Sequence, residues 1–266
     1  MEGIAGLHGW QWMFILEAVP AVILGFVTLF VLRNGPDDVT WLAPEQRAWL
    51  AARLQSERKV VRHVDQLSLW QVLFNKYVLA AALVYAGSSG ASACLSIWQP
   101  QIIKSFGLTN MQTGLLNSIP FGLASIVMVL WGRQSDRTGE RVWHTAVPLA
   151  ITAASLASAL LTNSLVPTIL ILCLAVTGTY AIKGPFWALS TEWLSASTAA
   201  AGIAQINAIG NLGGFVGTYF LGLIKDATGS YALGLLPLVA LTAAGSVMVL
   251  ILGRARPRTA VAQAAE

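Results

Sequence analysis

Hydrophobic and polar positions divide this chain into long apolar blocks separated by short polar turns. A helix needs about 20 apolar residues to cross the roughly 30 Å hydrocarbon core of a bilayer, because it rises about 1.5 Å per residue. Seven blocks are long enough to do so. The pattern therefore predicts an all-α polytopic membrane protein with seven spanning helices, at residues 10–32, 77–103, 111–132, 144–163, 166–190, 199–224 and 232–253.

One long polar segment follows the first block. Its start, Asn34-Gly-Pro-Asp-Asp, breaks a helix, whereas Pro44 suits the first turn of a new one. Leu50 and Leu54 share a face of that second helix, which predicts a short amphipathic helix over 44–58 at the membrane surface. We divide the chain into a first helix, a central loop, a six-helix region and a tail, at residues 1–33, 34–76, 77–253 and 254–266.

Composition supports a lipid environment and excludes several functions. Hydrophobic residues make up 56% of the chain and charged residues only 11%, against about 25% in soluble domains. The net charge of +4 does not indicate nucleic-acid binding, because basic residues alternate with apolar blocks. Cys94 and Cys173 lie in apolar blocks without a neighbouring Cys or His. No phosphate loop, metal-ligand set or nucleophile–base pair is visible, so we expect no cofactor, metal or enzymatic activity.

The distribution of positive charge predicts the orientation. Lys and Arg are retained on the cytoplasmic side of a membrane. With 33–76 inside, thirteen of the sixteen basic residues are cytoplasmic, Lys104 and Lys225 lie outside, and Lys183 lies within the membrane. We expect a multi-pass protein of the cytoplasmic (inner) membrane whose C-terminus is cytoplasmic. The N-terminus then lies outside, and an odd helix count suggests that a segment upstream is missing.

The last six predicted helices show an internal repeat. A shift of 90 residues superimposes two copies of Gly-x-x-x-Asp-x-Thr-Gly, which end at Gly139 and Gly229. Each copy follows the middle helix of a triplet, and the two copies fall on opposite sides of the membrane. Many transporters consist of such inverted triplets, so the repeat favours a transporter over a generic bundle.

The first copy lies in the ten-residue turn from Gly132 to Arg141. There a carboxylate is flanked by guanidinium groups, which can join helix ends in one conformational state of a transporter. Alternatively, the turn is basic and rich in glycine only because it is cytoplasmic. The candidate latch residues are Gly132, Asp136, Arg137, Gly139 and Arg141.

This turn resembles the hallmark loop of the major facilitator superfamily, in the copy of its C-terminal half. Other segments resemble its anion:cation symporter family, which includes tartrate, phthalate and hexuronate permeases. These segments are Trp98 to Leu108, Gly184 to Leu189 and Ile209 to Gly217, and the start from Gly9 through Glu17 to Pro20 resembles helix six. The resemblance implies a twelve-helix importer of small organic anions, coupled to a proton or a cation, of which this chain supplies helix six, the central loop and helices seven to twelve.

We therefore expect a small organic anion, a proton or cation, the lipid bilayer and a missing N-terminal half as partners. A second hypothesis is a non-transporting membrane fragment or assembly partner from a truncated gene. The sequence departs from the family pattern at Gln99, Ser190, Gln205 and Thr218. Because polar groups that face a central cavity set selectivity, these positions leave the substrate open.

Ionisable side chains inside a membrane cost about 2.5–3.5 kcal/mol to insert, so Lys183 and Glu17 are functional candidates. Lys183 precedes Gly184-Pro185, where the proline cannot donate to a backbone carbonyl. It suits carboxylate binding or proton sensing, or else it snorkels to the interface.

Six further polar or aromatic residues are candidates for the substrate or coupling path. Asn207 and Asn211 share a helix face near Gln205, and their amides either bind substrate or join helices. Trp98 and Gln99 are candidates to line the cavity, as is Trp187.

Overall fold

The computed structural model describes residues 3–33, 35, 38–39, 41–62, 69–193 and 199–254. These residues form helices and turns, and no strand occurs among them. The chain divides into two units, Met1–His63 and Val64–Glu266, each described here by itself. Apart from Arg254, the predicted tail lies outside the described residues. The functional division at 34–76 stays a prediction.

The first unit contains the first predicted span and the predicted surface helix. Helix α1 (Gly9–Val31) begins with a capping box between His8 and Gln11, and its side chains are almost uniformly apolar. Glu17 is an exposed exception. Helix α2 (Pro44–Arg62) confirms the helix expected over 44–58 and continues four residues further.

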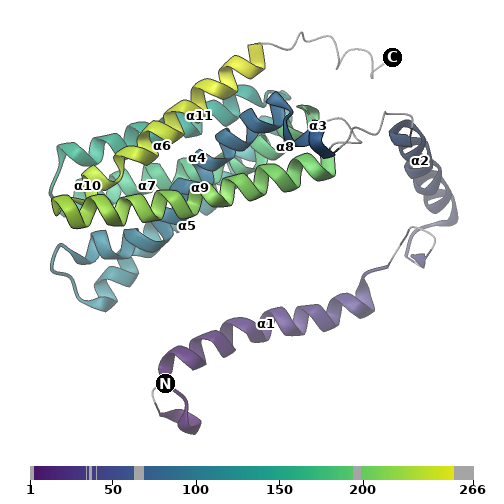
Figure 1. Ribbon diagram of the computed structural model, residues 1–266. Coiled ribbons are helices and arrows are strands. Elements are labelled where there is room, and N and C mark those ends of the chain that lie inside the picture. Colours follow the sequence, from purple (N-terminus) through teal and green to yellow (C-terminus); the bar gives the residue numbers. More distant parts are fainter. Residues whose placement is uncertain are drawn as a thin grey trace. The chain divides into compact units, whose positions relative to one another are not determined.

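The second unit is a bundle of long helices (Figure 1). All six spans predicted after residue 76 correspond to helices, although most extend a few residues further. A short helix, α3 (Leu69–Leu73), precedes the spans. The spans themselves are formed by α4 (Lys76–Lys104), α5 (Asn110–Thr138), α6 (Val142–Ser158) with η3 (Ala159–Leu161), α7 (Leu165–Ala181) with α8 (Lys183–Trp193), α9 (Ala199–Thr228), and α10 (Tyr231–Gly234) with α11 (Leu236–Arg254).

Six helices of the described part are long and apolar enough to span a membrane, namely α1, α4, α5, α6 with η3, α7 with α8, and α10 with α11. The expected seventh, α9, has 30 residues and therefore the length. Its polar residues and glycines keep it below the hydropathy of the others, so composition alone does not confirm the count of seven. Because α9 packs along α4, which is a candidate span, we place it in the membrane with its neighbour.

Close packing of α4 and α9 depends on glycine. A Cβ atom at Gly213 would lie 2.9 Å from the Cβ of Ala86, and one at Gly90 would lie 3.1 Å from the carbonyl oxygen of Gly213. Real Cβ atoms essentially never come as close as the first contact and seldom as close as the second, so glycine at these positions lets the two backbones approach closely. The glycine-rich spacing in α9 thus acts as a packing surface, as small residues do in membrane bundles.

The packing pattern agrees with two repeats of three helices. In the first triplet, α4, α5 and α6, the first helix packs mainly on α9, which is the middle helix of the second triplet. In the second triplet, α7 with α8, α9, and α10 with α11, the first helix packs in turn on α5. The third helices of the two triplets, α6 and α11, pack on each other. Exchanging the triplets leaves this pattern unchanged.

The two motif copies also fold alike. Gly139 and Gly229 both adopt the left-handed conformation, with φ of 64° and 72°, which favours glycine. The hydroxyls of Thr138 and Thr228 both donate to the carbonyl oxygen four residues earlier, at 2.9 and 2.6 Å. Successive spans of this unit alternate in direction, so its second span, α5, and its fifth span, α9, run in opposite directions. The repeat predicted from the sequence is therefore present as an inverted pair of turns.

Candidate functional site

Lys183 lies beside a cavity of about 250 Å³ between α4, α8 and α9. The lining is polar for a membrane bundle: it contains the hydroxyls of α4 and the amide of Asn211, and few apolar side chains. Its residues are Tyr85, Ser88, Ser89, Ser92, Ala93, Ser96, Lys183 and Asn211. Two sequence candidates, Lys183 and Asn211, are thus brought together.

The side chain of Lys183 is half-buried and lines this cavity. Helix α7 ends at Ala181 and α8 begins at Lys183, so the lysine follows a break in the span. Its Nζ lies 4.0 Å from the centre of the Tyr180 ring, a cation–π contact with the residue three positions earlier. The nearer end of the span is Glu192, on the other side of the lysine. Snorkelling would direct the amine toward that end, so this orientation favours a role inside the cavity.

No carboxylate of the described residues pairs with Lys183, whose side chain is half-buried. The cation therefore contacts the Tyr180 ring and shares the cavity with hydroxyl and amide groups. A lone positive charge at membrane depth is costly, and a bound anion would offset that cost. The cavity therefore has the charge and the polarity to bind a carboxylate.

The serine side of the cavity was missed from the sequence. Ser88 turns away and donates to the carbonyl oxygen of Thr179 at 3.2 Å, while Ser96 donates to that of Ser92 at 2.8 Å. Ser89 and Ser92 make no side-chain hydrogen bond within the described part of the chain, so their hydroxyls are available to a ligand. The sequence did contain a pattern that predicts this side of the cavity. The serines of α4 recur every three or four residues, so they lie on one face of the helix.

The amides of α9 separate into two groups. Asn211 donates to the side-chain oxygen of Asn207 at 3.0 Å, and both residues are exposed on this unit. Gln205 instead donates to the backbone carbonyl of Leu73 at 2.7 Å and joins α9 to α3. Asn207 thus supports the cavity residue Asn211, whereas Gln205 acts as a helix–helix contact.

The other candidates lie elsewhere. Trp98 packs on Tyr231, with ring centres 5.9 Å apart, and is not among the residues that line the cavity. Gln99 is fully buried and donates to the carbonyl oxygen of Asn117 on α5 at 3.3 Å. Glu17 belongs to α1 in the other unit. Trp187 packs beside the cavity residue Tyr85, with ring centres 5.0 Å apart.

The expected turn over 132–141 is shorter in the structure, because α5 continues to Thr138 and only residues 139–141 connect it to α6. In this 132–141 segment, still called the 132–141 turn, Arg141 makes the central contacts. Its Nη1 donates to Asp136 at 2.6 Å and to the fully buried Ser135 hydroxyl at 3.0 Å. Its Nε lies 4.0 Å from a carboxylate oxygen of Glu192 at the end of α8. Arg141 is only 18% exposed, whereas Asp136 is 69% exposed. The arginine, more than the aspartate, therefore ties this turn to the neighbouring helix.

Two other latch candidates have simpler positions. Arg137 is exposed in the last turn of α5 and makes no ion pair within the described residues. Gly132 lies inside α5, where an added Cβ would meet no atom within 4 Å. Only Gly139, at the left-handed end of α5, needs to be glycine for its conformation.

Glu140 caps the N-terminus of α6. Its carboxylate accepts the backbone N–H of Trp143 at 2.9 Å and that of His144 at 3.2 Å, and the His144 ring Nδ1 lies 3.2 Å away. Partial burial raises the pKa of the carboxyl, but the hydrogen bond from Trp143, followed by the contacts of His144, outweighs burial. The pKa of Glu140 is therefore lower than its ordinary value.

This lowered pKa predicts a pH-dependent contribution to stability. The contribution is present above the unfolded pKa of about 4.3 and is lost as the pH falls through the lower folded pKa. We expect Glu140→Gln to lower the thermal midpoint at pH 7 by about 1–2 °C, since the site is partly screened by solvent. The difference should shrink as the pH falls below the unfolded pKa of about 4.3 and vanish below the lower folded pKa. Thermal unfolding of the purified chain across this pH range measures it.

The matched control is Ser230→Ala, because the Ser230 hydroxyl caps α10 in the equivalent turn, where it accepts the Leu233 N–H at 3.3 Å. A serine does not titrate in this range, so its loss should have the same effect at every pH. A Glu140→Gln effect that is equally constant with pH would contradict the carboxylate cap.

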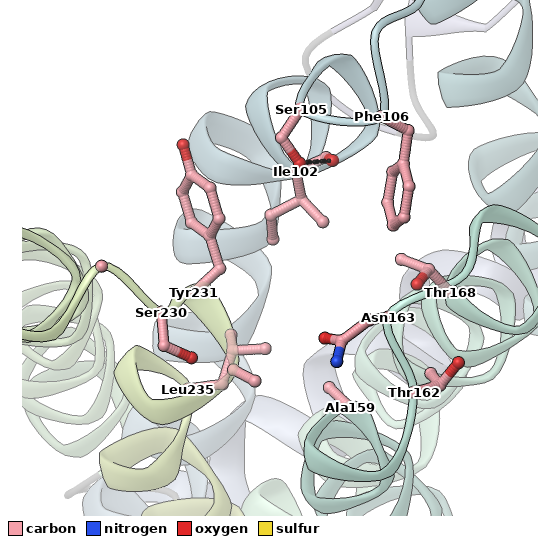
Figure 2. A pocket seen from close by; sticks show the side chains of 12 residues that line it. Ile102, Ser105, Phe106, Ala159, Thr162, Asn163, Thr168, Ser230, Tyr231 and Leu235 are labelled. Atoms are coloured by element: carbon pink, nitrogen blue, oxygen red, sulfur yellow. Dashed lines mark hydrogen bonds between the residues drawn. The ribbon is translucent and has the colours of Figure 1, made fainter.

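A larger cavity of about 470 Å³ lies at the opposite end of the bundle from the 132–141 turn. Figure 2 shows that its side chains come from three places: the end of α4, the turn between η3 and α7, and the start of α10. Hydroxyl, amide and apolar groups line it, and none of its lining residues is charged. It therefore offers no counter-charge to an anion, unlike the cavity beside Lys183.

The apolar helices and the bundle define a multi-pass membrane protein. A family model described as Major Facilitator Superfamily matches residues 2–218, and the chain belongs to that family.

A protein of Agrobacterium vitis named as a candidate tartrate transporter is 45% identical over 97% of this chain and 57% of its own length. A quinolone resistance transporter of Acinetobacter baumannii is 38% identical over 88% of this chain and 54% of its own length. The chain thus spans a little over half the length of these relatives.

A solved structure has the same fold. It is a bacterial homologue of the human lysosomal transporter Spinster, in an inward-facing and unoccupied conformation. The match has a TM-score of 0.51 and 18% identity, and covers 93% of this chain and 57% of the other. At this identity, the likeness concerns the fold alone.

Proposed function

We propose that Val64–Glu266 is the C-terminal half of a secondary transporter for small organic anions of the carboxylate class. The observation that carries this proposal is the unpaired amine of Lys183, which faces a hydroxyl-rich cavity in the membrane. A carboxylate would accept hydrogen bonds from this amine, from Asn211 and from the free serine hydroxyls. The cavity is below the roughly 300–1,000 Å³ typical of drug-sized ligands, which fits a small anion.

The exposed polar residues explain why a second half is needed. Asn207, Asn211 and Ser96 are exposed on this unit, at positions that the packing of α4 and α9 places in the membrane. Amides and hydroxyls that face lipid are unfavourable, so they normally face protein or a water-filled cavity. We infer that another six-helix half covers this face and completes the cavity, and that the two halves rock about the bound anion.

The relative named for tartrate supports a hydroxylated dicarboxylate as substrate, and we propose coupling to a proton or a cation. For orientation, we propose a cytoplasmic membrane location with the 132–141 turn and the C-terminus in the cytoplasm, as the charge bias predicts. The alternative of a non-transporting membrane partner keeps the same fold and differs in lacking anion binding.

Direct binding tests the proposal. The chain, assembled in lipid nanodiscs with the N-terminal half that the proposal requires, should bind tartrate saturably, measured by calorimetry or by tryptophan fluorescence, since Trp187 lies beside the cavity. Threitol, which has the same four-carbon skeleton and hydroxymethyl groups in place of the carboxylates, is the control and should not bind. Equal responses to both compounds, or none to tartrate, would favour the non-transporting alternative.

A further inference from the structure

The ring of Tyr85 on α4 is held in place at the cavity beside Lys183. It stacks on Phe186 of α8, with ring centres 5.4 Å apart and an angle of 13° between the planes, and it lies against Trp187 at 5.0 Å. Phe186 is only 1% exposed, so the support of the Tyr85 ring belongs to the core of the bundle. Stacked and tilted rings attract each other beyond the apolar area that they bury, so these contacts restrain the ring.

Helix α9 contacts the edge of the same ring through a glycine. A Cβ atom added at Gly210 would lie 2.7 Å from Cε1 of Tyr85, and its three nearest neighbours would all be atoms of that ring. Real Cβ atoms essentially never come this close, so a larger residue at position 210 would displace the ring. Gly210 therefore lets the α9 backbone lie directly against Tyr85, and α8 and α9 together fix the position of its ring.

The hydroxyl of Tyr85 is left without a partner. Tyr85 lines the cavity, and its phenol makes no hydrogen bond within the described part of the chain. It precedes Ser89 by four residues and Ser92 by seven, so the three residues share one face of α4. The phenol is thus a third unpartnered hydroxyl in the lining that contains Lys183, beside those of the two serines.

A restrained phenol discriminates between ligands where a serine does not. A serine hydroxyl that finds no ligand can donate to a carbonyl oxygen of its own helix, as Ser96 does with Ser92 at 2.8 Å. The Tyr85 oxygen is at the far end of a fixed ring and cannot reach the backbone of its own helix. A ligand that offers the phenol no partner therefore loses a hydrogen bond that the serines do not require, and it binds more weakly.

We propose that Tyr85 determines the specificity of the cavity for hydroxylated carboxylates, through a hydrogen bond between its phenol and a substrate hydroxyl, and that Gly210 positions it. Carboxylate oxygens only accept hydrogen bonds, and Lys183 and Asn211 supply donors for them. A substrate hydroxyl both donates and accepts, as a phenol does, so the two groups can pair in either direction. This assignment rests on the proposed function, since it requires that the cavity bind a small organic anion.

A comparison of tartrate with succinate tests the assignment, because succinate has the same four carbons and two carboxylates but no hydroxyl. Both affinities are measured by calorimetry on the chain assembled in lipid nanodiscs with the N-terminal half that the proposed function requires. We expect the parent to bind tartrate about tenfold more tightly than succinate. Tyr85→Phe keeps the ring and removes the hydroxyl. It should weaken tartrate binding about fivefold and change succinate affinity by less than about twofold.

Tyr231→Phe is the matched control. It also removes a phenol from a packed ring, 5.9 Å from the centre of Trp98, but Tyr231 lines the other cavity. It should change neither affinity. A tartrate-to-succinate ratio in Tyr85→Phe equal to that of the parent, or a parent that binds both anions equally, would overturn the specificity role and leave the proposed function intact. If neither anion binds the parent, the proposed function fails and this assignment fails with it.

A double-mutant cycle tests the positioning role of Gly210. Gly210→Ala should weaken tartrate binding at least as much as Tyr85→Phe does, because the added methyl group displaces the ring. In a Tyr85→Ala background, Gly210→Ala should have no further effect, since the ring that it displaces is absent. An equal loss from Gly210→Ala in both backgrounds would overturn the positioning role. If Gly210→Ala does not fold, Tyr85→Phe decides the specificity role alone, because it changes no packing volume in the core.

Discussion

Lys183→Gln should weaken tartrate binding to the chain assembled with its N-terminal half by roughly five- to 150-fold, which corresponds to about 1–3 kcal/mol. The amine is the one charged group among the residues that line the cavity, and it has no carboxylate partner in the described part of the chain. Glutamine keeps a hydrogen-bond donor but removes the charge that offsets an anion in a low-dielectric site. Lys183→Arg keeps the charge and should be less harmful.

Lys225→Gln is the matched control. Lys225 also lies over a tyrosine ring, 5.8 Å from the centre of Tyr231, but it pairs with Asp226 at 3.1 Å at the end of α9. Its loss should leave tartrate affinity unchanged. Bound tartrate should also protect the Lys183 amine from an amine reagent. Affinity of Lys183→Gln within twofold of the parent, together with no protection, would leave Lys183 a structural residue.

The spans were predictable because the membrane imposes one simple requirement. A helix across a bilayer needs a long apolar run, and six of the seven predicted runs are apolar enough by composition. The seventh, α9, is less apolar because it packs on α4 through glycines and carries the amides Asn207 and Asn211. Its length was visible in the sequence, but the reason for its composition was visible only from its packing.

The repeat was also predictable, since Gly139 and Gly229 need the same left-handed conformation in two equivalent turns. The partner of each polar side chain, by contrast, could not be predicted from the sequence. Gln205 bonds Leu73, which is 132 residues away in the sequence, and Gln99 bonds Asn117 on another helix. Such partners depend on helix rotation and packing, which local patterns do not determine.

The cavity itself was predicted only in part. Lys183 was identifiable because an intramembrane charge is costly, whereas Ser89 and Ser92 are small residues that occur throughout membrane helices. Only their position opposite Lys183 distinguishes them. Trp98 was a reasonable candidate by residue type, but its ring packs on Tyr231. Residue type alone thus identified the charged residue of the cavity, Lys183, but not the polar residues that surround it.

The second large effect concerns the turn between α5 and α6, where we expect Arg141→Gln to lower uptake about tenfold or more. Arg141 is mostly buried and donates to Ser135 and Asp136 while it lies near Glu192 on α8. Charge-assisted hydrogen bonds contribute about 1.5–3 kcal/mol each. Their loss from one conformational state shifts the ratio of the two states by about ten- to 150-fold, which stalls alternation.

Asp136→Asn should have a smaller effect, at most a few-fold, because the Asp136 carboxylate is 69% exposed and exposed ion pairs contribute about 0.2–1 kcal/mol. Arg137→Gln removes an exposed charge from the same turn and should leave uptake nearly unchanged. Uptake of labelled tartrate is measured in cells that express the chain together with the N-terminal half that the proposed function requires, with the membrane level of each variant determined in parallel. If all three variants reduce uptake equally, the general charge of the turn matters and the contacts of Arg141 do not. If none does at normal membrane level, the turn is a basic, glycine-rich connection without a latch.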